Sequence, residues 1–472
     1  MGCWVIGLLG ADILYSYDVT IGKVYFSVGG DSSGSNFSFN SELNQALITF
    51  ITSATKSVRL ANFNFTDDDP AGSSILDALI ERKNAGVTVK VVLDKYSSQG
   101  SGASVYNALL NAGISVKLDN ESGDPEMHNK FIVIDSDSGD TANGKVALGS
   151  ANFNDPQFSE DNNNFIIVER CPDLAFNYTK EFDQMFAGTF HTAKSNVKIA
   201  SSFSVDTGAI TIENYFSPYD NNIDKIIDKV DNSITRIYLA CYTFGSNDLA
   251  NALINAGSTR NVKVKIVFDK SQTFDNPSML QFYNDLLGRT NIEIFLSTKN
   301  PYGIMHHKFI IVDNTVITGS ANFTVSANEQ NDENDVFITG DNQLLSYFIL
   351  EFAKIFSGSV DTSGITVPSA EAPLQQTTSS KPENCPNPFI AGSGNNVTIR
   401  TKDREILHKA EIFDMRGRKI KEIVLPLNTT DRDIKWDGRD NNGNYMANGV
   451  YLYKLYVKNV REPLQGKLTL IK

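Results

Sequence analysis

Two copies of one short motif, His-x-Lys followed after four residues by Asp, are the residues of this chain best suited to chemistry. The copies are His128, Lys130 and Asp135, and His306, Lys308 and Asp313. Residues two apart on an extended strand point to the same side. Each histidine should therefore share a face with its lysine. A single short motif arises easily by chance, whereas two copies in matching surroundings indicate a functional site.

A small polar segment, Gly-Ser-Ala-Asn, follows each motif at the end of a further apolar run. It brings Ser150 and Asn152 back toward the first motif, and Ser320 and Asn322 back toward the second. The spacing between motif and segment differs because residues 136–143 form a longer loop rich in Asp, Ser and Gly. We therefore expect one site assembled from corresponding residues of two copies.

Together the motifs supply the groups that hydrolysis of a phosphodiester requires. One imidazole can attack phosphorus, and the other can protonate the leaving oxygen and then activate water. Two lysines and the Ser and Asn side chains can stabilise the charge on the nonbridging oxygens. Acidic partners can hold each imidazole in one tautomer. This chemistry predicts a phosphoric diester hydrolase that uses no metal and no cofactor.

The elements that must position these residues also occur twice. A strand, a helix and a second strand precede each motif. In the first copy they are Val58 to Asn64, Ile75 to Ala85 and Val87 to Asp94, and in the second they are Arg236 to Tyr242, Asp248 to Ala256 and Val262 to Asp269. Apolar β-rich runs that alternate with amphipathic helices predict an α/β fold with sheets covered by helices. We place the repeats at residues 23–200 and 201–358.

The rest of the chain differs in composition. Residues 359–382 are rich in Ser, Thr, Pro and Gln and predict a linker. Residues 383–472 hold short alternating runs between turn signals, which predicts a small all-β antiparallel sandwich. The apolar run from Cys3 to Ala11 resembles the hydrophobic part of a secretory signal without a basic residue ahead of it. Residues 1–22 are therefore a candidate signal remnant.

Charge is unevenly distributed along the chain. Residues 383–472 hold 16 Lys and Arg against 11 Asp and Glu, which leaves 26 against 44, a net charge of −18, for residues 1–382. A protein that binds nucleic acid without sequence preference presents a basic face to the phosphates. The acidic balance therefore argues against a tight nonspecific DNA-binding protein, although it leaves room for a small basic cleft.

The doubled motif with its downstream Gly-Ser-x-Asn resembles the phospholipase D superfamily over about residues 24–357. The resemblance implies a pseudo-twofold α/β sandwich with one catalytic centre between the halves and a covalent phosphohistidine. It implies that His128 is the nucleophile and His306 the acid, a choice that the residues themselves do not make. The phosphate ligands it implies are Lys130, Lys308, Asn152 and Asn322, with Ser150 and Ser320 beside them.

The acidic residue that the superfamily carries downstream of the motif matches Glu333. In the first copy the aligned position is Asn162, with Glu160 and Asp161 just before it. The partner that fixes the tautomer of one histidine is therefore left open.

Residues 385–472 resemble the FlgD-like immunoglobulin and secretion-system sorting domains of secreted bacterial proteins. The resemblance rests on Cys385 to Phe389, Phe413 to Arg418, Trp436 to Asp440 and Gly449 to Tyr453. It implies a secreted or cell-surface bacterial protein whose C-terminal domain contacts secretion or attachment machinery. A simple spacer is the alternative.

Several other residues receive a structural interpretation. We expect Phe153 and Phe323 in the core, Asp94 and Asp269 at solvated strand ends, and His307 pointing away from the site. His191 and His408 are expected at the surface or as satisfied core residues.

Three functions fit these patterns. The first is a secreted phospholipase D-type enzyme that degrades lipid by acting on phospholipid head groups, with transient contact to a membrane surface. The second is a secreted nuclease of the same fold, acting on DNA or RNA, and the third is a non-enzymatic surface binding protein on the same scaffold. The acidic charge mildly favours the first. The compact repeats and the phrases Met305 to Lys308 and Asn331 to Asn334 favour the second through resemblance to the small nuclease-like branch, so the sequence leaves these two open, and two intact motifs disfavour the third.

Overall fold

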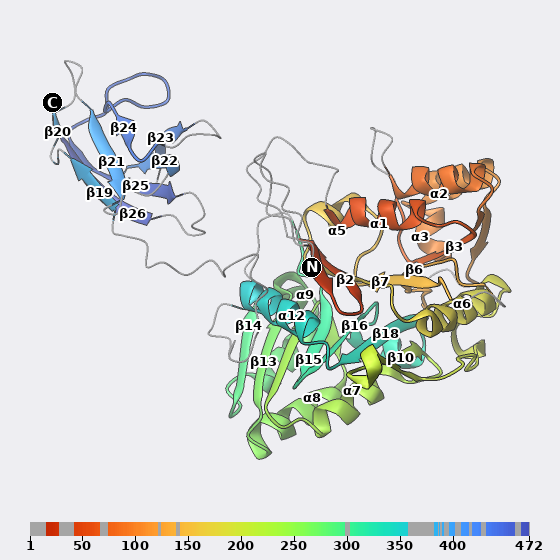
Figure 1. The fold of residues 1–472 in the computed structure, drawn as a ribbon. Coiled ribbons are helices and arrows are strands. Elements are labelled where there is room, and N and C mark those ends of the chain that lie inside the picture. Colours follow the sequence, from red (N-terminus) through yellow and green to blue (C-terminus); the bar gives the residue numbers. More distant parts are fainter. Residues whose placement is uncertain are drawn as a thin grey trace. The chain divides into compact units, whose positions relative to one another are not determined.

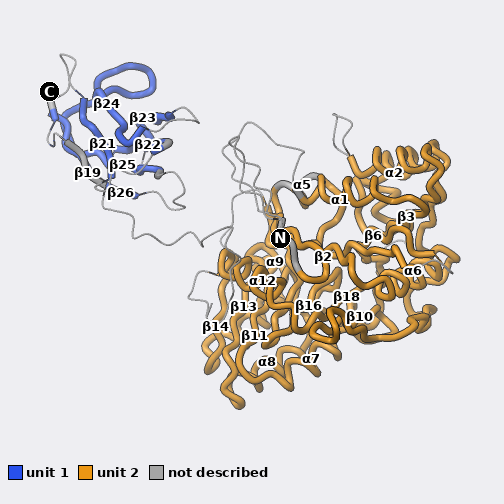
Figure 2. The backbone as a smooth tube through the Cα atoms, viewed as in Figure 1, with its two compact units in different colours: residues 1–13, 369–472 blue, residues 14–368 orange. Residues whose placement is uncertain are grey.

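The protein forms two compact units (Figure 2). The computed structural model describes residues 16–27, 42–66, 74–120, 124–137, 142–297 and 303–356 of the larger unit. Of the smaller unit it describes residues 382–385, 387, 389–390, 396–401, 407–414, 418–425, 431–457 and 464–471. Most of the expected signal remnant, the linker before Pro382 and the middle of the 136–143 loop lie outside these residues.

The first repeat is built on an eight-stranded sheet (Figure 1). In spatial order its strands are β1 (Ser16–Val19), β2 (Gly22–Ser27), β8 (Asn163–Val168), β7 (Lys145–Gly149), β6 (Lys130–Ile134), β3 (Ser57–Asn62), β4 (Thr88–Leu93) and β5 (Ser115–Leu118). Its helices are α1 (Glu42–Thr52), α2 (Ile75–Asn84), α3 (Lys95–Gln99), α4 (Ala103–Asn111), α5 (Asp155–Ser159) and α6 (Pro172–Phe186), and a short 3-10 turn spans His191–Ala193.

The second repeat has a sheet with the same order of corresponding strands. Read in the same direction, these are β9 (Ser202–Val205), β10 (Ile210–Ser217), β18 (Glu333–Thr339), β16 (Thr315–Gly319), β15 (Lys308–Val312), β11 (Arg236–Cys241), β13 (Lys263–Phe268) and β14 (Ile292–Leu296). Its helices are α7 (Asn222–Asp231), α8 (Asn247–Ile254), α9 (Lys270–Asp275), α10 (Pro277–Leu286), α11 (Val325–Glu329) and α12 (Asn342–Ile355). A π-helical turn spans Asn255–Thr259 and a 3-10 turn spans Asp206–Gly208. A separate two-stranded sheet pairs β12 (Phe244–Gly245) with β17 (Phe323–Thr324).

Strand direction is the same in the two sheets. Strand β3 pairs in parallel with β4 and antiparallel with β6, and β11 pairs in the same two ways with β13 and β15. Parallel pairs need a crossover, which the helices α2 and α8 supply. The predicted α/β fold of two corresponding repeats is confirmed, and the expected strands match the observed ones to within two residues at either end.

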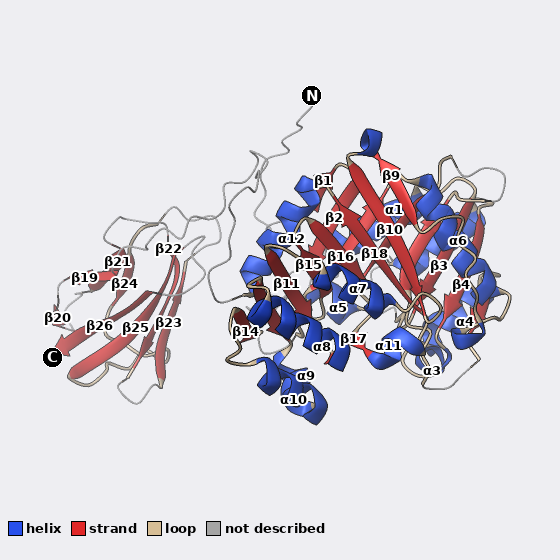
Figure 3. Cartoon of the chain, turned by 90° about the horizontal axis from the view of Figure 1, so that it is seen from below, coloured by secondary structure: helices blue, strands red, loops and turns tan. Residues whose placement is uncertain are grey.

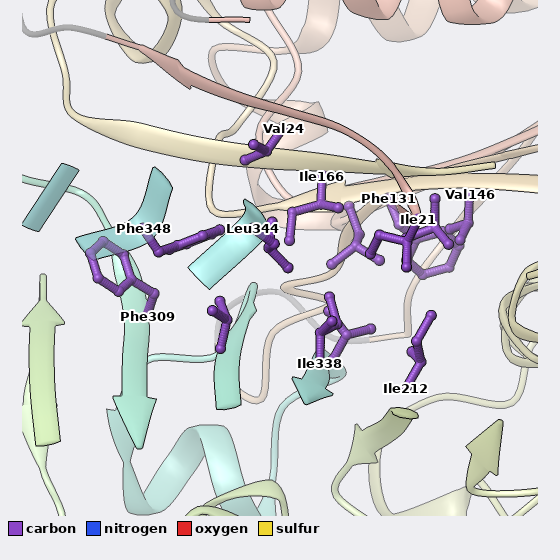
Figure 4. Packing of buried hydrophobic residues seen from close by; sticks show 14 of the residues in the cluster. Ile21, Val24, Phe131, Val146, Ile166, Ile212, Phe309, Ile338, Leu344 and Phe348 are labelled. Carbon is purple, nitrogen blue, oxygen red and sulfur yellow. The ribbon is translucent and has the colours of Figure 1, made fainter. Parts of the chain in front are cut away.

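The two repeats share one core between their sheets. Alternation along β6 sends Phe131 and Val133 into this shared core and Ile132 toward the outer helices, and β15 does the same with Phe309 and Ile310. Figure 4 shows Phe131 and Ile166 of the first sheet in the same cluster as Phe309 and Ile338 of the second, with Leu344 and Phe348 of α12 beside them. Burial on this scale holds the halves together by the hydrophobic effect.

Helices cover the outer face of each sheet. Leu47 of α1 and Leu79 of α2 pack on the first sheet, and Ile226 of α7 and Leu253 of α8 pack on the second. Helices α6 and α12 contribute to the core between the sheets. No helix in the described part of the chain has the length and apolar character to cross a bilayer.

The smaller unit is all β within its described residues (Figure 3). One sheet contains β19 (Pro382–Cys385), β21 (Val397–Thr401) and β24 (Ile434–Trp436), and the other contains β20 (Phe389–Ile390), β26 (Leu464–Ile471), β25 (Gly449–Val457), β22 (Leu407–Phe413) and β23 (Lys419–Val424). Trp436, 1% exposed, packs with Phe389 and Tyr451 in its core. The expected sandwich is confirmed for this unit, and its described strands pair antiparallel except β20, which pairs in parallel with β26.

Candidate active site

Each His-Lys motif begins a central strand and is held there by the opposite repeat. The backbone N–H of His128 donates to the carbonyl of Asp332 (3.0 Å), and that of His306 donates to the carbonyl of Asn162 (2.9 Å). Met127 and Met305, one residue ahead of each histidine, form the matching isolated bridges across the repeats. These crossed contacts bring both motifs to one place, so the site needs both repeats.

The two imidazoles have different hydrogen-bond partners. Nδ1 of His128 lies 2.8 Å from Oε1 of Glu333, and Nδ1 of His306 lies 2.8 Å from Oδ1 of Asn163. Both partners come from the repeat opposite to their histidine. The first ring therefore faces a carboxylate and the second a neutral amide.

Asn163, rather than Asn162, is the counterpart of Glu333, so the sequence alignment at this position was wrong by one residue. The Ser150 hydroxyl donates to Oδ1 of Asn163 (2.9 Å), and the Ser320 hydroxyl donates to Oε2 of Glu333 (2.6 Å), at the same separation along the chain. Asn162 instead uses its backbone to hold the second motif. An extended strand turns alternate side chains to opposite faces, so a shift of one residue exchanges a site residue for a structural one.

The expected direct contact of Ser150 and Ser320 with phosphate is also wrong. Each hydroxyl is fully buried, donates to the partner of a histidine, and accepts a backbone N–H, from Asn164 (3.1 Å) and Asn334 (3.0 Å) respectively. These serines orient the groups that orient the imidazoles.

The amide of Asn163 has only one orientation that satisfies its neighbours. Its Nδ2 donates to the carbonyl of Gln157 (3.0 Å), and its Oδ1 accepts the Ser150 hydroxyl. Since Oδ1 is an acceptor only, Nδ1 of His306 must carry a hydrogen to bond to it. The proton that this histidine exchanges is therefore on Nε2.

Both motif lysines are buried beside their own histidines. Nζ of Lys130 donates to the carbonyl of His128 (2.8 Å), and Nζ of Lys308 lies 3.2 Å from the carbonyl of His306 and 3.1 Å from its Nε2. Lys308 is thus fixed next to Nε2 of His306 and Lys130 next to the backbone of His128, where both can neutralise a phosphate.

Burial controls the protonation of the site. It lowers the pKa of both imidazoles well below the ordinary value, with the neighbouring lysines adding to the effect. It also lowers the pKa of Lys130 to about 8 and raises that of Glu333 to about 8. An anionic phosphate would favour the protonated forms of the histidines and lysines, so substrate binding and charging of the site are coupled.

Asp135 and Asp313 do not reach the histidines, which corrects their expected catalytic role. Asp135 follows the five-residue strand β6 and so lies about 15 Å from its start. Its carboxylate accepts the backbone N–H groups of Thr55, Lys56 and Ser57 at 2.7–3.1 Å. Asp313 accepts those of residues 234–236 at 2.8–3.1 Å. Both residues have φ of 52°, and both fix the turn that enters a central strand.

A cavity of about 570 Å³ opens at the two histidines. Asn152 and Asn322 line it, as expected for phosphate ligands, and the Oδ1 atom of each is buried without a hydrogen-bond partner. The remaining lining residues are Phe63, Asn64, Thr66, Ser101, Glu126, Asn154, Pro156, Gln157, Tyr242 and Ile304.

Two aromatic residues of the site were missed from the sequence. The ring of Phe63 lies 4.9 Å from that of His128, and the ring of Tyr242 lies 4.6 Å from that of His306, measured between centroids. Each ring also lies within 5.3 Å of the Nζ of the motif lysine in its repeat. Phe63 and Tyr242 follow corresponding strands, β3 and β11, and a comparison of the repeats at the strand ends would have found them.

The other structural interpretations have mixed outcomes. Phe153 and Phe323 are core residues and His307 points away from the site to Glu351, as predicted, and the side chain of His408 lies outside the described part. Asp94 and Asp269 are buried rather than solvated, because each caps a helix; Oδ2 of Asp269 also accepts the N–H of Met305 (2.8 Å). His191 is buried, with its ring between the carboxylates of Asp119 and Asp332.

Two imidazoles, two lysines and two amides around one site, on paired α/β repeats, are the groups that phosphodiester chemistry requires. Comparison with known proteins agrees. Residues 47–186 and 226–356 match the family model described as "Cardiolipin synthase, PLD-like domain", and residues 391–460 match the FlgD Ig-like domain. The chain belongs to the phospholipase D superfamily and carries a C-terminal FlgD-like immunoglobulin domain.

Individual relatives cover part of the chain. A protein named phospholipase D from Rickettsia typhi is 35% identical over 136 residues, which are 29% of this chain and 63% of that protein. The solved phospholipase D family member Nuc of Salmonella typhimurium is 30% identical and covers 31% of this chain and 93% of its own, with a TM-score of 0.29. The phosphatidylserine synthase of Haemophilus influenzae covers 72% of this chain and 87% of its own at 14% identity, with a TM-score of 0.52, and shows the same fold.

Proposed function

We propose that this protein is a metal-independent phospholipase D-type hydrolase that acts on phospholipid head groups through a phosphohistidine. The observation that carries the proposal is the pair of imidazoles that line one cavity, each bound through Nδ1 to a partner from the opposite repeat. Two buried ammonium groups supply the positive charge that a metal would otherwise supply.

The two steps follow from the partners of the rings. Nε2 of His128 attacks phosphorus, the P–N bond forms, and the bond to the leaving oxygen breaks as His306 gives that oxygen its proton. His306 then takes a proton from water, whose oxygen attacks phosphorus and releases His128. The Glu333 carboxylate beside His128 stabilises the positive charge on the phosphorylated ring, which supports His128 as the nucleophile.

Two features favour a phospholipid over a nucleic acid. Residues 1–382 carry a net charge of −18, and among the described residues that line the cavity there is no Lys or Arg beyond the two buried motif lysines to follow a polyanionic backbone. Relatives with the printed names "Phospholipase D" and "Mitochondrial cardiolipin hydrolase" support a lipid substrate.

One panel of substrates tests this function: phosphatidylcholine vesicles, bis-p-nitrophenyl phosphate, and single- and double-stranded DNA. The wild type should cleave the lipid and the small diester, with or without EDTA, and His306→Asn should cleave the lipid at no measurable rate. Cleavage of DNA alone would favour the nuclease function. Activity that EDTA abolishes and a divalent ion restores would contradict metal independence. No cleavage of any substrate would favour a binding protein.

We further propose that the protein acts outside a bacterial cell or at its surface, because FlgD-like domains of this kind resemble sorting modules and residues 391–460 match one. The C-terminal unit would then contact secretion or attachment machinery. Detection of the full chain in the medium or on protease-accessible surfaces of producing cells would support this location, and retention in the cytoplasm would contradict it.

A further inference from the structure

The two walls of the active-site cavity differ at one pair of corresponding positions, Glu126 and Ile304. Each lies two residues ahead of a motif histidine. The N–H of Glu126 donates to Oδ1 of Asn331 (3.1 Å), and the N–H of Ile304 donates to Oδ1 of Asp161 (2.6 Å). The same backbone bond to the opposite repeat holds both residues, and both line the cavity. One wall therefore carries a carboxylate where the other carries an aliphatic side chain.

The carboxylate of Glu126 has no hydrogen bond or ion pair among the described residues, although the side chain is half-buried. Burial raises its pKa, and the nearby His128 and Lys130 only partly offset this effect. Lys130 is buried and donates instead to the His128 carbonyl. A ligand that placed a positive charge in the cavity would offset the cost of desolvating this carboxylate.

Phe63 adds an aromatic surface to the same wall. It lines the cavity, its ring lies 4.9 Å from that of His128, and Glu126 interacts electrostatically with the same histidine. A carboxylate and an aromatic ring that line one cavity beside the same histidine are suited to an ammonium or quaternary ammonium group, which the ring attracts through its quadrupole. The corresponding described residues of the opposite wall, Ile304 and Tyr242, carry no charge themselves.

We propose that Glu126 and Phe63 form a subsite for the positively charged amino alcohol of a zwitterionic phospholipid, such as choline or ethanolamine. This inference rests on the proposed phospholipase function and narrows its substrate class. Only two carbons join the ammonium to the ester oxygen, so the charge can turn back over the cavity mouth toward Glu126 while that oxygen faces His306. A substrate with an anionic or neutral alcohol lacks this interaction.

The test compares two lipids that differ in the charge of the alcohol. Phosphatidylcholine and phosphatidylglycerol are presented in the same mixed micelles to the full-length wild type, to Glu126→Gln, and to Glu81→Gln as a matched control on the exposed face of α2. We expect the ratio of kcat/KM for choline lipid over glycerol lipid to fall about tenfold in Glu126→Gln and to stay at the wild-type value in Glu81→Gln. An equal fall for both lipids would leave the ratio unchanged and overturn the proposal, because Glu126 would then only balance the charge of the motif lysines.

A second measurement separates this proposal from the phospholipase assignment. Tetramethylammonium should inhibit wild-type hydrolysis of bis-p-nitrophenyl phosphate competitively, and about tenfold more weakly in Glu126→Gln. If the wild type cleaves the small diester but neither lipid, the phospholipase assignment fails, while this change in inhibition would still support the cation subsite. Equal inhibition of both proteins overturns the subsite whichever lipid is cleaved.

Discussion

His128 and Glu333 lie 205 positions apart in the chain, in different repeats, and their side chains meet at 2.8 Å between Nδ1 and Oε1. The corresponding contact on the other side joins His306 to Asn163. Each histidine is thus oriented by the repeat that does not contain it. The two halves of the site have corresponding geometry but different partners for the imidazoles. A carboxyl group beside one ring and an amide beside the other give the two rings different chemistry.

The different roles of the rings predict a trapped intermediate. p-Nitrophenol leaves without help from an acid, so His306→Asn should still form the covalent bond to His128 from bis-p-nitrophenyl phosphate, while water attack loses its base. Turnover should fall at least about 1000-fold. Mass spectrometry of the quenched variant should find the p-nitrophenyl phosphate adduct on His128. An adduct on His306 in the His128→Asn variant instead would reverse the two roles.

Asn163 should set the pH dependence of the reaction. In Asn163→Asp a carboxylate of the same shape accepts the Nδ1 hydrogen of His306 and stabilises its protonated form, so the pKa of this acid rises. The alkaline limb of kcat/KM against pH should move up by about one unit or more. Glu333→Gln is the matched change beside His128. It removes the carboxylate that stabilises the protonated ring, so the acidic limb of the same profile should move to lower pH. If both variants lost activity while the two limbs of the pH profile stayed at the wild-type pH values, these residues would act on structure alone.

Asp135 should matter for stability rather than for chemistry. Burial alone would raise its pKa, but the N–H donors of Thr55, Lys56 and Ser57 hold the pKa below its ordinary value. Its stabilising effect is therefore present above about pH 4, the pKa of an unfolded aspartate, and is lost as the pH falls through the lower folded value.

In Asp135→Ala these donors lose their acceptor, and the free energy of unfolding should fall by about 2 kcal/mol at pH 7. Denaturant titration at pH 7 and pH 3 measures this difference, which should shrink at the lower pH. The corresponding variant Asp313→Ala is the control and should behave in the same way. A large loss of kcat in fully folded protein would contradict a purely structural role.

His191 should make the stability of the larger unit fall in mildly alkaline solution. Burial lowers its pKa, but Asp119 and Asp332 raise it more, to about 9. The folded protein therefore holds a proton that the unfolded chain has lost above its pKa of about 6.5. Stability should decline by up to about 1.4 kcal/mol per pH unit between pH 6.5 and pH 9. Thermal unfolding of wild type and His191→Gln checks this, and an equal slope in both would exclude the histidine as its source.

Much of this fold could be predicted because its signals are local and occur twice. The spacing of apolar residues predicts strands such as Lys263–Phe268 and the amphipathic helix α8. The repetition then shows which residues of the two copies correspond. The motif histidines, lysines and asparagines were found by the same repetition. The catalytic role predicted for Asp135 was wrong because the motif shows only that this residue recurs with His and Lys. The five-residue strand between them places Asp135 at the opposite end of the sheet from His128.

The sequence by itself determined the repeats, the strand that carries each His-Lys pair, and the set of groups that phosphodiester chemistry would use, because each depends on residue type and on spacing of a few positions. Only the tertiary structure decided which side chains meet across the repeats. The pairs His128 with Glu333 and His306 with Asn163 depend on how two strands from different repeats align, and a shift of one residue would turn Asn163 away and present Asn162. Such alignment is fixed by packing of the shared core between the sheets, which no local pattern in the sequence encodes.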